Sequence, residues 1–410
     1  MSGITRRSRL SRLSRLSRLS RKSRKPKKIP TINSQPSTLI TIPCLKVGGT
    51  EMQTLHLVEA LVDSGHPCVT VCYFEYDFQM VQLFEQAGSR VVCLSAYGDR
   101  PSGNRETYRF LKAGLKRVVN EYRPKVAMVQ YMAPGAMPLI ILRRLGIKDI
   151  VAMLHTDADI YKSLRLVRFL QRHVARLFTC VSETAERNFF GNSNLIGTQV
   201  VTRKRSHCTL PNCLPKDFSF GKPQPTTLNS QFTIGLVARL ESIKGVDIAI
   251  PAFARVLENM PDCRLLIVGN GSMRKMMQTQ QQELHIPDNR IEWAGTVDNR
   301  KLSDYYGRMT LVWVPSRSEG FGLAAVEAMG MGCPVVAADV GGLKEIVHDG
   351  IDGRLFIPEN TDDLAEKTLQ LLSDTETLQS MSAQTVANAR KYSFDIYRER
   401  VNTIIENQTL

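Results

Sequence analysis

The chain has 410 residues, too many for one ordinary hydrophobic core, so its length predicts two domains. With 43% hydrophobic and 23% charged residues it has the composition of a soluble globular protein, and no apolar run reaches the ~18 residues that a membrane-spanning helix needs. The formal net charge of +15 suggests a nucleic-acid partner, but residues 1–30 hold twelve Lys and Arg and no acid, which leaves 42 basic against 39 acidic residues elsewhere. The excess charge therefore belongs to the N-terminal segment and not to a basic nucleic-acid-binding domain.

Residues 1–37 form a basic, low-complexity tail with the three-residue repeat SRLSRLSRLSRLS. It lacks the unbroken apolar stretch of a secretory signal peptide. Three interpretations stay open: a disordered solvated arm, a peripheral contact of residues 1–30 with an anionic membrane, and a contact with RNA or DNA. We rank the arm first and nucleic acid last, because no aromatic residue is interleaved to stack on bases.

The nine cysteines include no CxxC pair, and most lie in apolar, strand-like stretches. Without a signal peptide, this predicts reduced core thiols in a cytoplasmic protein. Cys208 and Cys213 flank a predicted loop near His207, but two cysteines without a second pair are weak evidence for a metal site.

Past residue 37, apolar strands alternate with amphipathic helices. The strands are unbroken apolar runs, as expected when both faces of a parallel sheet are covered. We expect strands at 38–43, 68–74, 90–96, 125–131, 149–155 and 176–182, and helices at 48–65, 78–87, 106–122 and 161–170. This alternation predicts a doubly wound α/β domain over residues 38–220.

Residues 221–231 (GKPQPTTLNSQ) combine two prolines with polar residues and no periodicity, which predicts a linker. The alternation then restarts, with strands expected at 232–239, 263–269, 290–295, 311–315 and 334–338 and helices at 246–258 and 274–284. We therefore expect a second, similar domain over residues 232–390, facing the first across a central cleft. A last helix, within residues 391–410, is expected to cross back to the first domain.

The sequence PSRSEGFGLAAVEAMGMGCPVVAADVGG (315–342) sets Glu319 and Glu327 on either side of a Gly-Phe-Gly turn, at the end of a predicted buried strand. The free N–H groups of a helix that begins after Gly320 and Gly322 suit a phosphate. A glutamate further into that helix is able to accept hydrogen bonds from two ribose hydroxyls. A lone pair of glutamates would more often be solvated surface acids, but the surrounding glycines favour a ligand site.

Other polar groups also follow predicted strands. Arg239 and Lys244 come after the first strand of the second domain, where two cations are able to clamp a pyrophosphate or else form surface salt bridges. Gly48 and Gly49 lie between the first strand and its helix, and Gly271 lies in a similar turn.

His155 ends a predicted strand. A lone histidine is more often a satisfied core residue, but its place at a strand's carboxyl end raises the case for a functional role.

Taken together, the segments GGTE, HTD, VSE, LPNCL, VARLESIKG, VGNGS and the long stretch from Ser318 resemble the retaining glycosyltransferases of family 4 (group 1), which have the GT-B fold. The resemblance covers residues 38–395, and its most specific part is the E-x7-E pair, Glu319 and Glu327. One departure is Cys213, where the family usually has glycine, so we infer no acceptor from this loop.

The resemblance implies a role for each matching residue. Glu327 would hold the ribose of a nucleotide sugar and Glu319 the transferred sugar; Arg239 and Lys244 would neutralise the diphosphate, and His155 would contact the donor sugar. The remaining donor-site residues it implies are Gly48, Gly49, Gly271, Val297, Gly320, Phe321, Gly322 and Leu323.

The expected function is transfer of a sugar from a nucleotide-diphospho-sugar to a glycan or lipid-linked acceptor, with retention of configuration. Alternatives are a GT-B nucleotide-sugar epimerase or phosphorylase and a non-catalytic nucleotide-sugar-binding protein. We expect the protein to be cytoplasmic, with a peripheral contact at the inner face of the membrane. We expect no metal cofactor, because fixed cations supply the positive charge and the Asp157–Asp159 match to an Asp-x-Asp motif is short.

Overall fold

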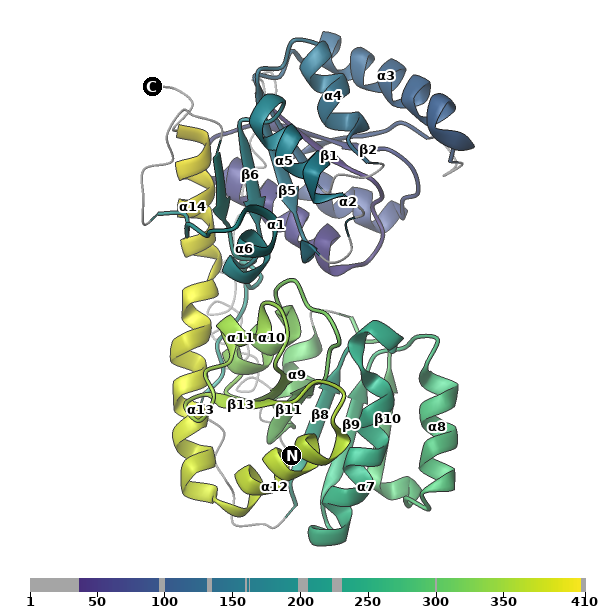
Figure 1. Cartoon of the computed structure of the whole chain (residues 1–410), viewed down its shortest axis with the longest axis vertical. Helices are drawn as coiled ribbons and strands as arrows, with labels where there is room; N and C mark the ends of the chain where they lie inside the picture. The colour runs from purple at the N-terminus through teal and green to yellow at the C-terminus, as the bar shows by residue number, and fades with distance from the viewer. Residues whose placement is uncertain are drawn as a thin grey trace, which may run out of the picture. The chain divides into compact units, whose positions relative to one another are not determined.

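The computed structural model describes residues 37–95, 100–130, 135–158, 161, 163–197, 206–222, 231–298 and 301–406. The predicted basic tail up to residue 36, most of the predicted linker and Asp159 lie outside the described residues. The described chain forms two lobes, each built on a parallel sheet with helices on both faces, which confirms the predicted α/β class (Figure 1). Within the described residues, no helix is both long enough and apolar enough to cross a membrane.

The sheet of the first lobe has the strand order β3-β2-β1-β4-β5-β6-β7, and its pairs are parallel. The order reverses at β1, as in a doubly wound sheet, so the loops after β1 and β4 diverge there. The strands are β1 (Thr38–Ile42), β2 (Cys68–Cys72), β3 (Arg90–Cys93), β4 (Val126–Gln130), β5 (Asp149–Leu154), β6 (Leu177–Cys180) and β7 (Ser206–Thr209). The apolar pattern does not predict β7, because two of its four residues are Ser and His.

Helices cover both faces of this sheet. Successive strand residues point to opposite faces, so Leu39 belongs to one hydrophobic cluster and Ile40 to another. The first cluster packs under α3 (Gly103–Tyr122), α4 (Met137–Arg144), α5 (Leu164–His173) and α6 (Glu183–Phe190), and the second under α1 (Gly49–Asp63), α2 (Phe78–Gln86) and α14 (Phe394–Glu406). Helix α5 begins at Leu164, three residues later than expected, because the Ser163 hydroxyl caps it by accepting from Leu166 N.

The sheet of the second lobe has the order β10-β9-β8-β11-β12-β13, again parallel. Its strands are β8 (Thr233–Val237), β9 (Arg264–Val268), β10 (Ile291–Gly295), β11 (Leu311–Val314), β12 (Val335–Ala338) and β13 (Gly353–Phe356). Helices α7 (Ala249–Asn259), α8 (Arg274–Glu283) and α12 (Thr361–Ser373) pack on one face, and α9 (Leu302–Tyr306), α10 (Leu323–Gly330) and α11 (Leu343–Ile346) on the other. The helix expected from residue 246 begins as a 3-10 turn, Val246–Ile248, and continues as α7.

The C-terminal helices connect the two lobes. Helix α13 (Thr375–Ala389) packs against α10 in the second lobe. After a 3-10 turn, α14 contributes Phe394, Tyr397 and Val401 to the same hydrophobic cluster as α1 (Figure 1). The last described helix is therefore part of the core of the first lobe.

Candidate functional site

Two loops of the second lobe hold the backbone around Glu319. Gly342 N donates to the Glu319 carbonyl oxygen at 2.9 Å. Gly341 has φ +47, and a Cβ there would lie 2.0 Å from that same oxygen. Gly322 caps α10 with φ +113 and packs against Leu343. Glycine is required at both positions, so the turn is held rigidly at the carboxyl end of β11.

Lys244 and Glu319 form an ion pair, with Nζ and Oε2 2.6 Å apart. Lys244 ends the 3-10 turn Ser242–Lys244 after β8, and Ser316 Oγ donates to the same Glu319 oxygen at 3.2 Å. Their side chains are 25% and 16% exposed, which leaves both within reach of a ligand. Two predicted site residues, 75 positions apart in the chain, are thus brought into direct contact.

Glu327 lies in α10 and accepts a hydrogen bond from the Tyr306 hydroxyl, with Oη and Oε2 3.0 Å apart. Burial raises the pKa of Glu327 to about 7, and the bond from Tyr306 opposes this rise. Burial and the neighbouring Glu327 also raise the pKa of Tyr306, so the phenol stays a donor. The result is a half-buried carboxyl group that gains or loses its proton near neutral pH.

The loop after β8 also carries Arg239 and Glu241. Arg239 is exposed. The hydrogen bonds from Ser272 lower the pKa of Glu241, and the positive charge of Arg239 lowers it further. Glu241 accepts from Ser272 N at 3.1 Å and from its hydroxyl at 2.6 Å. A Cβ on Gly271 would lie 2.4 Å from Leu240 O, so the predicted Gly271 turn packs directly on this loop.

His155 follows β5 in the first lobe and is half-buried. Its Nε2 lies 2.6 Å from the side-chain oxygen of Gln130, the last residue of β4. Burial lowers the pKa of His155 to about 4, so the ring is neutral at pH 7. Since an amide oxygen only accepts, Nε2 carries the proton of this neutral ring.

The turn of the second lobe lies against these first-lobe residues. A Cβ added to Gly320 would lie 2.7 Å from His155 O, so only glycine permits this approach. A Cβ on Gly49, the first residue of α1, would lie 3.6 Å from a Leu323 methyl group. The segment that carries Glu319, Gly320 and Leu323 thus lies close to two predicted residues of the first lobe, His155 and Gly49.

The remaining predicted residues lie around this group. Gly48 caps α1 in an extended conformation. Phe321 is buried against the Tyr392 ring, with centroids 5.3 Å apart. Val297 follows β10 and packs on the hydrophobic cluster that also contains Tyr306.

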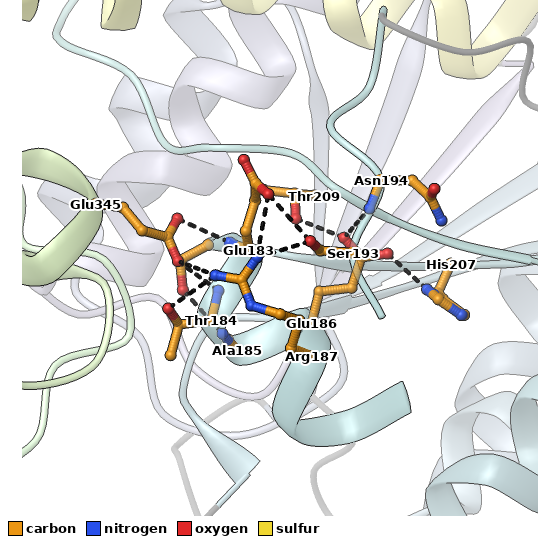
Figure 2. Close-up of polar contacts among 11 residues, drawn as sticks. Glu183, Thr184, Ala185, Glu186, Arg187, Ser193, Asn194, His207, Thr209 and Glu345 are labelled. Carbon is orange, nitrogen blue, oxygen red and sulfur yellow. Dashed lines mark hydrogen bonds and ion pairs between the residues drawn. The ribbon is translucent and has the colours of Figure 1, made fainter. Parts of the chain in front are cut away.

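A second carboxylate, Glu345 of α11, links the second lobe to α6 of the first (Figure 2). It accepts from Glu183 N at 2.9 Å and from Thr184 N, while Arg187 lies 3.7 Å away. The Ser182 hydroxyl accepts from the next free N–H group of α6, that of Ala185. These side chains thus satisfy the first three N–H groups of α6.

Sequence reasoning missed Tyr306, Gln130 and Glu345, and nothing in their local sequence marks them as partners of the predicted residues. The metal interpretation of the cysteines also finds no support. His207 and Cys208 lie on β7, where the His207 ring turns to the buried Glu186 (Figure 2), while Cys213 contacts His56. In the described part of the chain, no three His, Cys, Asp or Glu side chains gather as a metal site would require.

Two family models match this chain. The "Glycosyl transferase 4-like domain" matches residues 48–188, in the first lobe, and "Glycosyl transferases group 1" matches residues 220–391, which include Lys244, Glu319 and Glu327. The two parallel-sheet lobes and these matches define a GT-B glycosyltransferase. The chain belongs to the group 1 glycosyltransferases.

Curated relatives match mainly over part of the chain. The D-inositol 3-phosphate glycosyltransferase of Segniliparus rotundus is 35% identical over 170 residues, 40% of this chain and 38% of that protein. The poly(glycerol-phosphate) alpha-glucosyltransferase of Bacillus subtilis is 30% identical over 190 residues, 44% of this chain and 28% of that protein. The matched region spans less than half the length of these relatives.

Solved structures resemble the whole fold. HepE of Anabaena in complex with UDP and glucose superposes with a TM-score of 0.73 at 20% identity, covering 90% of this chain and 99% of that one. Sucrose-phosphate synthase of Thermosynechococcus elongatus also reaches 0.73, at 18% identity, covering 92% and 99%. At this identity the likeness establishes the GT-B fold and not the substrate.

Proposed function

We propose that this protein transfers a sugar from a nucleotide-diphospho-sugar to a glycan or lipid-linked acceptor, with retention of anomeric configuration. The observation that supports the proposal best is the packing of Gly320 against the His155 backbone, because it brings the loop that carries Glu319, the ion-pair partner of Lys244, against the first lobe.

The donor half of the proposal rests on Glu327 and Lys244. Two vicinal hydroxyls of a ribose are the natural donors to a half-buried carboxylate such as Glu327. The complexes of HepE with UDP and with UDP-glucose make uridine diphosphate sugars the first donors to test. The acceptor half rests on the relatives' names alone, which include an inositol phosphate and a poly(glycerol-phosphate).

Charge stabilisation of the leaving diphosphate would come from fixed groups of the second lobe. Lys244 and Arg239 would neutralise the phosphates, and the N–H groups at the start of α10 would donate hydrogen bonds to a further phosphate oxygen. Preorganised groups of this kind contribute ~3 kcal/mol each to lowering a barrier. In the front-face course that we favour, the leaving phosphate takes the acceptor's proton while Glu319 orients the sugar.

The same groups underlie the proposal that transfer needs no divalent metal. Turnover should persist in excess chelator, and activity abolished by EDTA and restored by Mn²⁺ or Mg²⁺ would overturn this part of the mechanism.

The deciding experiment is a calorimetric panel of UDP-, GDP- and ADP-sugars, followed by product analysis. One nucleotide sugar should bind, and NMR of the product should report the donor's anomeric configuration. Binding without hydrolysis or transfer to any sugar, inositol phosphate or glycerol phosphate acceptor would favour the non-catalytic alternative. Epimerisation of the nucleotide sugar, without transfer to an acceptor, would favour the alternative of an epimerase.

A further inference from the structure

Arg317 lies in the loop after β11, two residues before Glu319, and it is not among the predicted site residues. Its main-chain N–H donates to the Ile243 carbonyl oxygen at 2.9 Å. Ile243 is the middle residue of the 3-10 turn Ser242–Lys244, which follows β8, and β8 is the neighbour of β11 in the sheet. The main chain of Arg317 therefore joins the loop that carries Glu319 to the turn that carries Lys244.

The Arg317 guanidinium holds this turn as well. Its Nη1 donates to the Ser242 carbonyl oxygen and, at 2.7 Å, to Asp247 Oδ1, while Nη2 donates to Asp247 Oδ2 at 2.7 Å. Asp247 lies in the next 3-10 turn, Val246–Ile248, and the hydrogen bonds from Arg317 lower its pKa. One planar guanidinium therefore fixes the chain on both sides of Lys244, through a bidentate pair that an ammonium group cannot form.

Gly245, directly after Lys244, packs on the same loop. It has φ +61, and a Cβ there would lie 1.9 Å from the Pro315 carbonyl oxygen. Only glycine permits so close an approach. Both chain neighbours of Lys244, Ile243 and Gly245, therefore contact residues 315–317, and the main chain at Lys244 is fixed by the protein itself.

Two other roles for Arg317 agree less well with its contacts. A third cation on the diphosphate would need N–H groups to spare, but Nε donates to Glu359 and both Nη atoms donate to the acceptors named above. A surface ion pair contributes little, which applies to Glu359, because its side chain is 61% exposed. The side chains of Arg317 and Asp247 are only 27% and 26% exposed, and their pair bridges two loops. This favours a role in holding the loops.

We propose that Arg317 is a positioning residue that acts on sugar transfer through Lys244. A lysine side chain is long and flexible, so its charge is preorganised at a leaving group only where its main chain is fixed. Arg317 supplies that restraint and thereby orients the Lys244–Glu319 pair. The inference rests on the proposed function, since it takes Lys244 as the cation that binds the leaving diphosphate.

The first test is a double-mutant cycle on kcat/KM with Arg317→Lys and Lys244→Ala. Arg317→Lys keeps the charge but loses the bidentate pair, and it should lower kcat/KM on the order of 10- to 100-fold, because misplaced catalytic groups lose this much. In the Lys244→Ala background the same change should have no further effect, because the group that Arg317 positions is already gone. A merely structural role would lower kcat/KM by the same factor in both backgrounds, and that result would overturn the proposal.

Two further variants check that the pair with Asp247 is the cause. Asp247→Asn leaves Arg317 in place but weakens the bidentate pair, so it should also lower kcat/KM, again only while Lys244 is present. Arg290→Lys is the matched control, because it breaks a comparable pair of the same lobe, that of Arg290 Nη2 with Asp262 at 3.0 Å. It should leave kcat/KM unchanged, and a loss equal to that of Arg317→Lys would count against the proposal. Circular dichroism establishes that each variant is folded.

The second test needs no substrate, so it separates a failure of this inference from a failure of the proposed function. The ligand-free protein is acetylated with limiting acetic anhydride, and peptide mass spectrometry gives the rate at Lys244 relative to exposed Lys275. In Arg317→Lys this relative rate should rise several-fold, because an amine released from a carboxylate loses its proton more readily. Unchanged labelling of Lys244 would refute the positioning role. Faster labelling in the variant, without nucleotide-sugar turnover by the wild type, would refute the proposed function and leave the restraint on Lys244 established.

Discussion

Lys244 Nζ and Glu319 Oε2 lie 2.6 Å apart, so the cation expected to bind a leaving diphosphate neutralises the acid expected to bind the sugar. A diphosphate that enters beside Lys244 would compete with Glu319 for the ammonium group and free the carboxylate to accept from sugar hydroxyls. We therefore propose that the pair couples the binding of the two halves of the donor.

Lys244→Ala should lower kcat/KM by ~10²–10³, because a fixed charge at the leaving group acts most strongly in the transition state. Affinity for the free nucleoside diphosphate should fall as well, as measured by calorimetry. Lys275→Ala, a change of an exposed lysine on α8, is the matched control and should leave both quantities unchanged. Wild-type kcat/KM in the Lys244 variant would remove this residue from the site.

Glu327→Ala should weaken binding of the nucleotide sugar by about 1.5–3 kcal/mol, the range for hydrogen bonds to charged groups. The free nucleotide should lose the same amount, because the ribose is common to both ligands. Exposed Glu258 on α7 gives the control, Glu258→Ala. Unchanged affinity for the free nucleotide would end the assignment of Glu327 to the ribose.

The raised pKa of Glu327 predicts a pH-dependent stability. The unfolded pKa is 4.5 and the folded pKa about 7, so the folded state binds the extra proton and stability falls as pH rises between these values. Glu327→Gln removes this titration. Its free energy of unfolding relative to wild type should rise by about 3 kcal/mol between pH ~4.5 and pH ~7, measured by urea denaturation. A difference that does not vary with pH would show that Glu327 has an ordinary pKa.

We expect Gln130 to fix the tautomer of the His155 ring by accepting the hydrogen bond from Nε2. In Gln130→Leu the acceptor for Nε2 is lost, and ¹⁵N NMR of the labelled ring should report a changed tautomer mixture together with a lower kcat/KM. Gln130→Glu restores an acceptor and, as a nearby carboxylate, should raise the pKa of His155 above its value of about 4. The acid limb of the pH–rate profile should then move to higher pH. An unaltered ring spectrum in Gln130→Leu would contradict the positioning role.

Glu345→Ala should reduce the free energy of unfolding by about 1–2 kcal/mol, because it leaves the N–H groups of Glu183 and Thr184 without their acceptor. Urea denaturation measures the loss. Glu366→Ala, on exposed α12 surface, should have little effect and serves as the control. Equal stability of the two variants would mean that water replaces the Glu345 carboxylate at no cost.

Local pattern alone predicted most of the fold. Unbroken apolar runs such as LLIV and VVAA identify strands buried on both faces, and parallel strands require helical crossovers, so the α/β class follows from periodicity. The residues at strand ends were predicted for the same reason, since loops after parallel strands meet at one edge. Strands β7 and β13 were missed because neither contains a continuous apolar run.

The sequence by itself determined where the glycine turns, the strand ends and the Glu319–Glu327 pair lie along the chain, because these are properties of local chain geometry. Only the tertiary structure decided what each side chain meets. Tyr306 reaches Glu327 across 21 residues, and Glu345 reaches Glu183 across 162. Such pairs depend on how helices pack on a sheet and how two lobes meet. Long-range packing therefore sets the protonation of Glu327 and the tautomer of His155, since burial and hydrogen-bond partners shift a pKa and no spacing along the chain encodes them.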